Sequence, residues 1–250
     1  MHVRKSMCPA RFPAESGRAV GYGPGVTTVP ARRGPRVDVD AKTLIIDTAE
    51  RMFGDATVDA VSLRAVAREA GLGNRAVPYH FPTKRDLLAA VLRRRSSALA
   101  QAITDGLSLL IRRETPPVVR DVIEAILMPF VNMFREDPRG TLRWIKVYTQ
   151  LALAEDQIWA SDLGTDPSIT DLFLTAAGRA LPEINDEKVL RRVGIAMYSM
   201  ITILAGTDLP AYGQPLGPDG LDPDWVEQLV IFTTAGLQGQ VNPQQDEVRE

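Results

Sequence analysis

The sequence has few of the residues from which most catalytic and metal sites are built. Its 250 residues include one cysteine, Cys8, and two histidines, His2 and His80. A single cysteine excludes an intramolecular disulfide and a cysteine zinc cage, and it fits a reducing compartment such as the cytoplasm. The sequence also lacks a phosphate loop, a dinucleotide fingerprint, a nucleophile elbow and any metal-ligand spacing, so we predict no enzyme, no metal and no cofactor. Paired carboxylates in the C-terminal half are the remaining enzymatic alternative.

Long hydrophobic runs are absent too. The N-terminus is charged and is soon interrupted by Pro9 and Pro13, so it has no run that could serve as a signal peptide. The longest late stretch without charge, 193–207, would span about 22 Å as a helix, against about 30 Å for a hydrocarbon core. We therefore expect no helix that spans a membrane, and so no membrane partner of that kind. The hydrophobic content of 45% and the net charge of -2 exclude a chain that is disordered throughout.

Charge is unevenly distributed along the chain. Residues 1–95 contain 17 Lys and Arg against 9 Asp and Glu, while residues 96–250 contain 12 against 22. A basic N-terminal part joined to an acidic C-terminal part favours a protein that binds a polyanion at one end, either nucleic acid or an anionic membrane surface. A chance scatter of arginines is the alternative interpretation.

Helical periodicity begins near residue 38. Residues 1–37 are rich in Pro, Gly and Arg without any apolar period, which predicts a disordered basic arm. Apolar residues at i, i+4, i+7 and i+8 from Ile45 predict a helix that starts near Asp40. Ser62 is a candidate N-cap for a second, short helix that Gly71 ends. A third helix is expected over about 73–80.

The rest of the chain also has a helical pattern. Thr83 and Asp86 form a capping-box pattern at the start of a long fourth helix. No convincing strand follows, and the polar end over 240–250 is expected to be a flexible tail. Further helices are predicted over 117–136, 139–156, 168–180, 186–206 and 223–238, with an irregular Pro- and Gly-rich loop over 208–224. The predicted fold class is therefore all-α.

The segment 67–81 has the pattern of a helix-turn-helix. Two helices that meet at a sharp angle need a residue that accepts positive φ, which is Gly71. They also need a small residue four positions earlier, Ala67, and an apolar plug six positions after the glycine, Val77. All three are present, so the segment predicts a helix-turn-helix whose second helix enters the major groove of DNA.

The same segment and its surroundings resemble the N-terminal domain of the tetracycline-repressor (TetR) family of bacterial regulators. The resemblance covers about residues 42–92. It rests on the order and spacing of Ile45 to Phe53, Ser62-Leu63-Arg64, Val66-Ala67, Ala70-Gly71-Leu72, Tyr79-His80-Phe81, Thr83-Lys84 and Leu87-Leu88.

The resemblance implies a function and a domain plan. Family members bind a palindromic operator as homodimers through a three-helix helix-turn-helix domain, and a helical C-terminal domain dimerises and binds a small effector. Applied to this chain, the plan gives a DNA-binding domain over 38–84 and an α-helical ligand-binding and dimerisation domain over 85–239. Repression is the family default. A helical ligand-binding or signalling dimer that no longer binds DNA is the alternative.

The family pattern also implies which residues contact DNA. Asn74, Arg75 and Ala76 match the start of the recognition helix, where Arg75 could bind a guanine edge and Asn74 an adenine edge. The remaining matched positions are expected to contact phosphates or the groove edge and to fix the register of the dimer. These positions are Ser62, Arg64, Tyr79, His80, Thr83 and Lys84.

Two departures from the family pattern affect this prediction. Pro78 stands inside the recognition helix, where it cannot donate to the carbonyl of Asn74, so we expect a tilted last turn. Thr57 stands where members often carry the glycine that ends the first helix, and Gly54 lies nearby. His80 is open to two interpretations, a pH switch or a phosphate or packing contact.

Two groups of arginines have alternative interpretations as well. Arg32, Arg33 and Arg36 of the arm could enter the minor groove or form a solvated tail. The run 93–95 could form a solvated helix face or a DNA clamp.

The C-terminal half contains candidates for an effector pocket and a dimer interface. An apolar or aromatic effector is expected between helices that carry Met128, Phe130, Met133, Phe134, Trp144, Tyr148 and Trp159, although an ordinary core is the alternative. The last two helices are expected to pack against their copies as a four-helix interface, with burial inside the monomer as the alternative. Their candidate interface residues are Val193, Met197, Met200, Ile201, Leu204, Trp225, Leu229, Phe232 and Gly236.

Overall fold

The computed structural model describes residues 35–158 and 168–239, and it describes side chains from residue 40 onward. Most of the predicted basic arm and the predicted tail over 240–250 lie outside these residues. In the described part, helices dominate and the only strands form one short hairpin, so the predicted all-α fold class is confirmed.

The N-terminal part contains three α-helices and a 3-10 turn. They are α1 (Pro35–Asp55), η1 (Val58–Ala60), α2 (Leu63–Glu69) and α3 (Ala76–His80). The predicted stripe of α1 is buried, because Ile45, Ala49 and Phe53 have no solvent exposure. The helix begins at Pro35, five residues before the expected start near Asp40, so the last residues of the predicted arm are helical.

Helix α4 (Lys84–Arg112) connects the two parts of the molecule. Its predicted capping box is present: the Thr83 hydroxyl accepts from the Asp86 N–H at 3.1 Å, and an Asp86 carboxylate oxygen accepts from the Thr83 N–H at 2.9 Å. The expected domain boundary after residue 84 falls at the first residue of this helix. The backbone therefore passes from one domain to the other without a flexible linker.

Among the described residues, the C-terminal part contains five further helices that agree with the predicted ranges to within three residues. They are α5 (Val119–Glu136), α6 (Pro138–Leu153), α8 (Ile169–Ala180), α9 (Asp186–Ala205) and α10 (Pro223–Gln238). Polar N-cap side chains accept main-chain N–H groups at the starts of four of them and so fix where each helix begins. These caps are Asp137, Ser168, Asn185 and Asp222.

The loop between α9 and α10 is more ordered than the sequence predicted. It contains η2 (Pro210–Tyr212) and an antiparallel hairpin of β1 (Leu216–Gly217) and β2 (Gly220–Leu221). Gly220 has φ of 111° and lies against the backbone of α5, where a Cβ would come within 3.1 Å of the Arg135 Cα. The absence of a side chain therefore lets the hairpin dock on α5, a tertiary contact that local composition does not encode.

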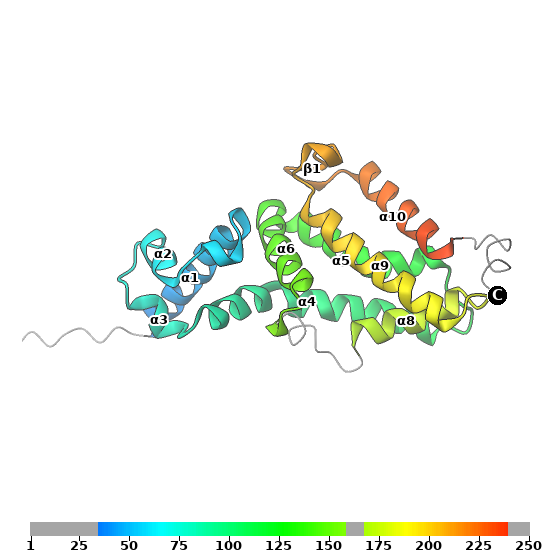
Figure 1. The fold of residues 1–250 in the computed structure, drawn as a ribbon, viewed down its shortest axis with the longest axis horizontal. Helices are drawn as coiled ribbons and strands as arrows, with labels where there is room; N and C mark the ends of the chain where they lie inside the picture. The colour runs from blue at the N-terminus through cyan, green and yellow to red at the C-terminus, as the bar shows by residue number, and fades with distance from the viewer. Residues whose placement is uncertain (1–34, 159–167, 240–250) are drawn as a thin grey trace, which may run out of the picture.

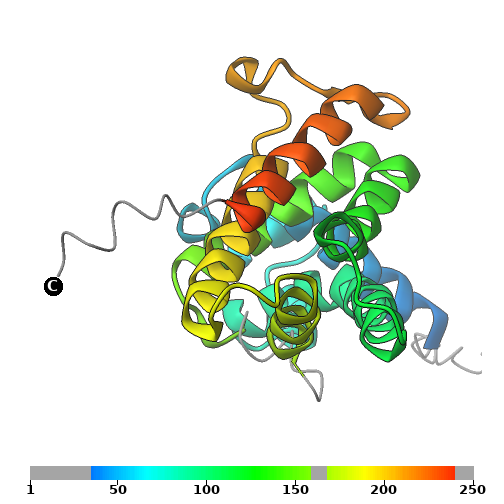
Figure 2. The ribbon, with the colours of Figure 1, turned by 90° about the vertical axis from the view of Figure 1, so that its right-hand side faces the viewer.

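The helices form an elongated molecule (Figure 1). Helices α1, α2 and α3 form one end, α6 lies between α1 and the remaining helices, and α4 runs along both parts. Figure 2 shows α9 and α10 side by side on one flank of the C-terminal part. One hydrophobic core extends through both parts, from Ile45 in α1 to Leu237 in α10.

Candidate nucleic-acid interface

The turn between α2 and α3 has the geometry that the sequence predicted for a helix-turn-helix. Gly71 has φ of 66°, the left-handed region that favours glycine. The Leu72 N–H donates to the Ala67 carbonyl at 2.9 Å and closes the turn. Ala67 and Val77 have no solvent exposure, so the small residue and the apolar plug fill the angle between the two helices.

The start of α3 differs from the prediction. The expected helix over about 73–80 begins only at Ala76, with Arg75 as its N-cap, because the Ala76 N–H closes a turn on the Gly73 carbonyl at 2.8 Å. Asn74 and Arg75 therefore lie in the turn that leads into the helix. Both are exposed, so their side chains remain accessible at the end of the molecule.

Pro78 does not disrupt α3. The Tyr79 N–H donates to the Arg75 carbonyl at 3.1 Å and the Phe81 N–H to the Val77 carbonyl at 2.8 Å, so the hydrogen bonds on both sides of the proline are made. A helix of five residues loses only the bond that Pro78 cannot donate. Tyr79, which follows the proline, is 77% exposed at the outer surface.

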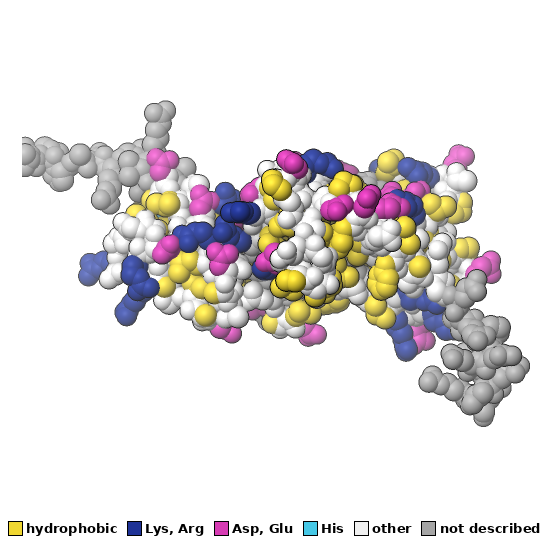
Figure 3. Space-filling view, turned by 90° about the horizontal axis from the view of Figure 1, so that it is seen from above, with side chains coloured by type: hydrophobic (Ala, Val, Ile, Leu, Met, Phe, Trp, Pro, Cys, Tyr) yellow, Lys and Arg dark blue, Asp and Glu magenta, His cyan; other side chains and the backbone are white. Residues whose placement is uncertain are grey.

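The other predicted contact residues lie at the same end of the chain. Ser62 caps α2, since its hydroxyl accepts from the Ala65 N–H at 3.1 Å, and Arg64 in the first turn of α2 is exposed. Thr83 caps α4, and the ammonium of Lys84 donates to the Asp59 carbonyl at 3.3 Å. Figure 3 shows Lys and Arg side chains projecting from the end formed by α1–α3.

His80 is partly buried beside two aromatic rings. Its ring lies edge-on to Tyr79 with centroids 5.0 Å apart, and tilted to Phe81 with centroids 6.5 Å apart. These ring contacts favour the second interpretation, a phosphate or packing contact, over the pH switch. Lys42, which the sequence prediction did not include, lies 5.8 Å from the centroid of the buried Phe81 ring and adds a cation to this end.

Arg93 and Arg94 are exposed on α4, as the solvated-face interpretation expects, while Arg94 and Arg95 pair with acidic side chains of neighbouring helices. Arg95 pairs with the buried Glu50 of α1 at 3.1 Å and with Asp137, the N-cap of α6, at 2.6 Å. Arg94 pairs with Asp47 of α1. The arginine run gave no sign of these contacts, because the acidic partners lie more than 40 positions away in the sequence.

Helices α1 and α6 also touch directly at the same junction. Gly54 lies against Arg143, and a Cβ on this glycine would come within 2.5 Å of the Arg143 Cβ. Arg143 in turn pairs with Asp55 at 3.0 Å. Gly54, which lies near the position where family members often carry a helix-ending glycine, therefore allows a close approach between the domains.

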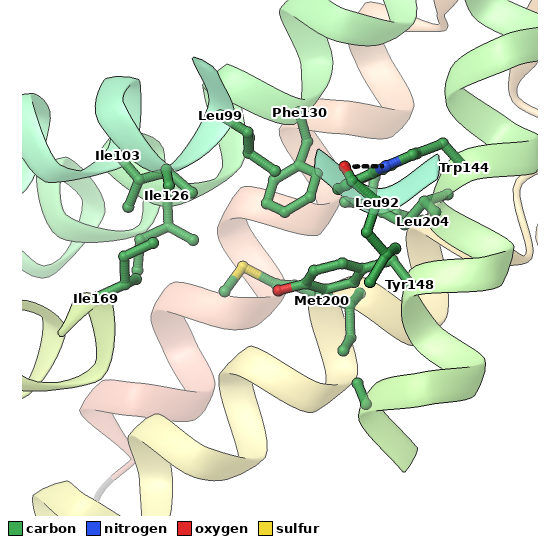
Figure 4. Packing of buried hydrophobic residues seen from close by; sticks show 14 of the residues in the cluster. Leu92, Leu99, Ile103, Ile126, Phe130, Trp144, Tyr148, Ile169, Met200 and Leu204 are labelled. Carbon is green, nitrogen blue, oxygen red and sulfur yellow. Dashed lines mark hydrogen bonds between the residues drawn. The ribbon is translucent and has the colours of Figure 1, made fainter. Parts of the chain in front are cut away.

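The residues predicted to line an effector pocket form part of the core. Trp144 and Phe134 have no solvent exposure, Phe130 and Tyr148 have little, and Met128 and Met133 are partly buried. The Trp144 indole N–H donates to the Leu92 carbonyl at 3.0 Å, and its ring stacks on Tyr148 with centroids 5.0 Å apart (Figure 4). Trp159 lies outside the described residues. The effector pocket stays a prediction.

The predicted dimer residues need a correction, because most of them are buried inside the single chain. Side chains buried in the monomer cannot pack against a second copy. This applies to Val193, Met200, Ile201, Leu204 and Leu229, while Met197 and Trp225 are partly buried and pack on the same core. Phe232, 68% exposed, and Gly236 are the two predicted residues that remain at the surface.

Apart from Phe232, the large apolar residues that α9 and α10 expose are not among the predicted ones. Ile195 and Tyr198 of α9 and Ile231 and Phe232 of α10 are exposed. Between the two helices lies a groove of about 90 Å³, lined by Ile195, Phe232 and Gly236 among others. A second apolar stripe on these helices is the sequence signal that could have found this face. One apolar side of a helix is enough to pack on the core, so a second apolar side is available for another contact.

Neither a cluster of metal ligands nor a membrane-spanning helix occurs among the described residues. No group of three or more His, Cys, Asp or Glu side chains in that part of the chain is placed to hold a metal ion. No helix of residues 35–158 and 168–239 is both long enough and apolar enough to cross a membrane.

Comparison with known proteins identifies the family. Residues 45–91 match the family model of bacterial regulatory proteins of the tetR family, and residues 124–236 match the model of the tetracyclin repressor-like C-terminal domain. The two models cover both parts of the molecule in the expected order. The chain belongs to the TetR family and is a DNA-binding transcriptional regulator.

Individual relatives agree with this family at low sequence identity. The HTH-type transcriptional regulator BetI of Rhizobium meliloti (strain 1021) is 24% identical over 124 residues, which are 49% of this chain and 58% of that protein. Two solved structures share the fold. A TetR family regulator from Marinobacter aquaeolei VT8 has 17% identity and a TM-score of 0.51 over 80% of this chain and 97% of its own. The fatty acid degradation regulator FadR from Bacillus halodurans has 11% identity and a TM-score of 0.52 over 80% and 99%.

Proposed function

We propose that this chain represses transcription as a homodimer bound to a palindromic operator, and that a small apolar or aromatic effector in the C-terminal domain releases it. The observation that carries the DNA-binding part is the intact helix-turn-helix, with Asn74, Arg75 and Tyr79 exposed at the end of the molecule. Both matching family models describe regulators, so we infer no enzymatic activity. A regulator of bacterial transcription acts where the DNA is, in the cytoplasm.

The proposed DNA contacts divide into two kinds. Arg75 and Asn74, in the turn before α3, are the candidates for base edges, where a bidentate pair contributes about 1–3 kcal/mol of discrimination. The candidates for phosphate or groove-edge contacts, which set the register of the dimer on DNA, are Ser62, Arg64, Tyr79, His80, Thr83 and Lys84. Pro78 was the reason to consider a dimer that no longer binds DNA. Because the hydrogen bonds on either side of it in α3 are made, Pro78 no longer favours that alternative.

Selection of binders from a random duplex DNA library tests whether the chain binds a palindromic operator. The salt concentration should be near-physiological, because phosphate contacts weaken steeply with ionic strength. We expect an enriched inverted repeat with half-sites about one helical turn apart. The double variant Arg75→Ala and Lys84→Ala should lose this binding while remaining a folded dimer. The charge-matched control Arg112→Ala and Arg139→Ala removes two exposed arginines of the C-terminal part and should keep it. Equal binding by both double variants would contradict the site.

The dimer is proposed to form through the exposed stripe on α9 and α10. Two large apolar side chains, Ile195 and Phe232, are each 68% exposed and border the groove between these helices. In a two-fold arrangement the same patch meets its copy, so the Phe232 ring of one protomer can enter the groove of the other. Burial of such aromatic side chains is a frequent source of the affinity of an interface.

Sedimentation velocity tests this interface with a pair of variants. Phe232→Glu should convert the dimer to monomer at micromolar concentration, because it places a charge at the centre of the contact. Leu109→Glu puts the same charge at a side chain of α4 that is 53% exposed, and it should leave the dimer intact. A dimer that survives Phe232→Glu together with Ile195→Glu would show that the chain associates through another face.

A further inference from the structure

A cavity of about 520 Å³ lies at the junction of the two domains. It is bordered by η1, by the first turns of α4, and by the end of α6 with the turn that follows it. Its volume is within the range of small-molecule sites, about 300–1,000 Å³. None of the described residues that we predicted to form the effector pocket lines it, so it is distinct from the core around Trp144.

One wall of the cavity offers hydrogen-bond donors. The Oε1 of Gln150 accepts from the Val58 N–H at 3.0 Å, which fixes the orientation of the amide and leaves its NH₂ group without an acceptor among the described residues. The ammonium of Lys84 donates to the Asp59 carbonyl, and no carboxylate in the described part of the chain forms an ion pair with it. Two donors, one of them positively charged, therefore border the same space.

The charged side chains given for the cavity lining balance formally, two cations against two carboxylates, but neither carboxylate is paired with Lys84. Arg85 and Asp156 pair with each other at 3.2 Å. The Asp59 carboxylate also borders the cavity and opposes an anionic ligand. The rest of the lining includes three apolar side chains, Leu88, Leu151 and Ile158. A cation and an amide donor beside an apolar wall match a ligand with one anionic group and an apolar body.

The opposite side of the same junction is closely packed. Gly54 lies against Arg143 with no room for a methyl group, and Arg143 pairs with Asp55. Arg143 and Gln150 are about 10 Å apart along α6, which is two helical turns. A ligand in the cavity would therefore act between η1 and α6, next to a contact that is already closely packed.

We propose that this cavity binds a small amphipathic carboxylate, with its anionic group on Lys84 and the Gln150 NH₂ and its body on Leu88, Leu151 and Ile158. The regulatory consequence rests on the proposed function, because Lys84 is also a proposed phosphate contact. A ligand that engages Lys84 competes with DNA, so it lowers operator affinity. By linkage, DNA lowers the affinity for the ligand by the same factor.

Isothermal titration calorimetry on the full-length chain without DNA tests the site itself, with sodium octanoate as the probe and 1-octanol as the neutral control. We expect octanoate to bind with a stoichiometry of one per chain and 1-octanol to bind at least about tenfold more weakly. Gln150→Glu keeps the acceptor for the Val58 N–H and adds a negative charge to the wall, so it should weaken octanoate binding about tenfold. Asp59→Asn removes the opposing charge and should strengthen it about fivefold.

Asn132→Asp is the matched control, since it makes the same amide-to-carboxylate change on an exposed residue of α5. It should leave the affinity for octanoate unchanged. Absence of octanoate binding at millimolar concentration overturns the proposal. Binding that is insensitive to both Gln150→Glu and Asp59→Asn also overturns it, because the probe then occupies another site.

A second measurement separates this proposal from the proposed function. Octanoate should lower operator affinity for the native chain about tenfold and for Gln150→Glu about twofold or less, as measured by fluorescence anisotropy with the selected DNA. If the chain binds octanoate as expected but selects no operator, the cavity site stands and the repressor function fails. If it binds an operator whose affinity octanoate does not change, the regulatory role of the cavity is refuted.

Discussion

The contact between Gly54 and Arg143 predicts that replacing glycine by alanine lowers the free energy of unfolding at position 54 but raises it at position 178. In Gly54→Ala, the new Cβ would lie 2.5 Å from the Arg143 Cβ and 2.7 Å from its Cα. Unstrained carbon atoms stay about 3.5–4.0 Å apart, so α1 and α6 must separate by about 1 Å. Such overpacking costs about 1–3 kcal/mol. Alanine in a helix gains about 0.5–1 kcal/mol over glycine, which leaves a net loss of about 0–2.5 kcal/mol.

Gly178→Ala in α8 is the matched control, because a Cβ there would meet no atom within 4 Å. Only the helix propensity changes at this position, so the variant should gain about 0.5–1 kcal/mol. Urea denaturation followed by circular dichroism at one fixed protein concentration measures both, since the stability of a dimer depends on concentration. If Gly54→Ala gains as much stability as Gly178→Ala, α1 and α6 do not approach each other as described. The close packing that we describe opposite the cavity, at the junction of the two domains, would then be refuted as well.

Three further predictions concern stability. Thr83→Ala removes the hydroxyl that accepts from the Asp86 N–H and should lower the free energy of unfolding by about 1 kcal/mol in urea melts; an unchanged midpoint would refute the cap. Trp144→Phe loses a buried hydrogen bond and ring volume, so it should lower the free energy of unfolding in urea melts by about 1–3 kcal/mol. A decrease of less than roughly 0.5 kcal/mol, the limit of such comparisons, would contradict the described packing of Trp144. Burial alone would raise the pKa of Asp137, but hydrogen bonds from Arg95 and the Gly140 N–H lower it below the ordinary 3.8. Its carboxylate therefore stabilises the fold above pH 3.8, an effect lost as the pH falls through the lowered pKa. Asp137→Asn should then be less stable than the native chain at neutral pH but equally stable in acid, and an equal deficit at both pH values would oppose this assignment.

Local signals in the sequence were sufficient for the helices and for the helix-turn-helix. The turn depends on three residues within eleven positions, Ala67, Gly71 and Val77, and its geometry follows from positive φ and close packing alone. N-caps such as Ser62 and Thr83 act within three residues of themselves. These features were predictable because each interaction joins residues that are neighbours in the chain.

Other features depend on residues that the sequence separates. The role of Arg95 was not predictable, because Glu50 and Asp137 come beside it only when α1 and α6 pack on α4. The cavity at the domain junction likewise has walls from three distant segments.

The proposed dimer face on α9 and α10 combines a feature that the sequence determines with one that only the tertiary structure determines. The sequence determined that α9 and α10 are amphipathic helices, because apolar period is a local property. It did not determine which of two apolar stripes faces the core, and Val193 and Leu204 are buried in the monomer while Ile195 and Phe232 are exposed. Only the packing of α9 against α6, α8 and α10 decides this, since the rotation of a helix about its axis is set by the neighbours that it contacts.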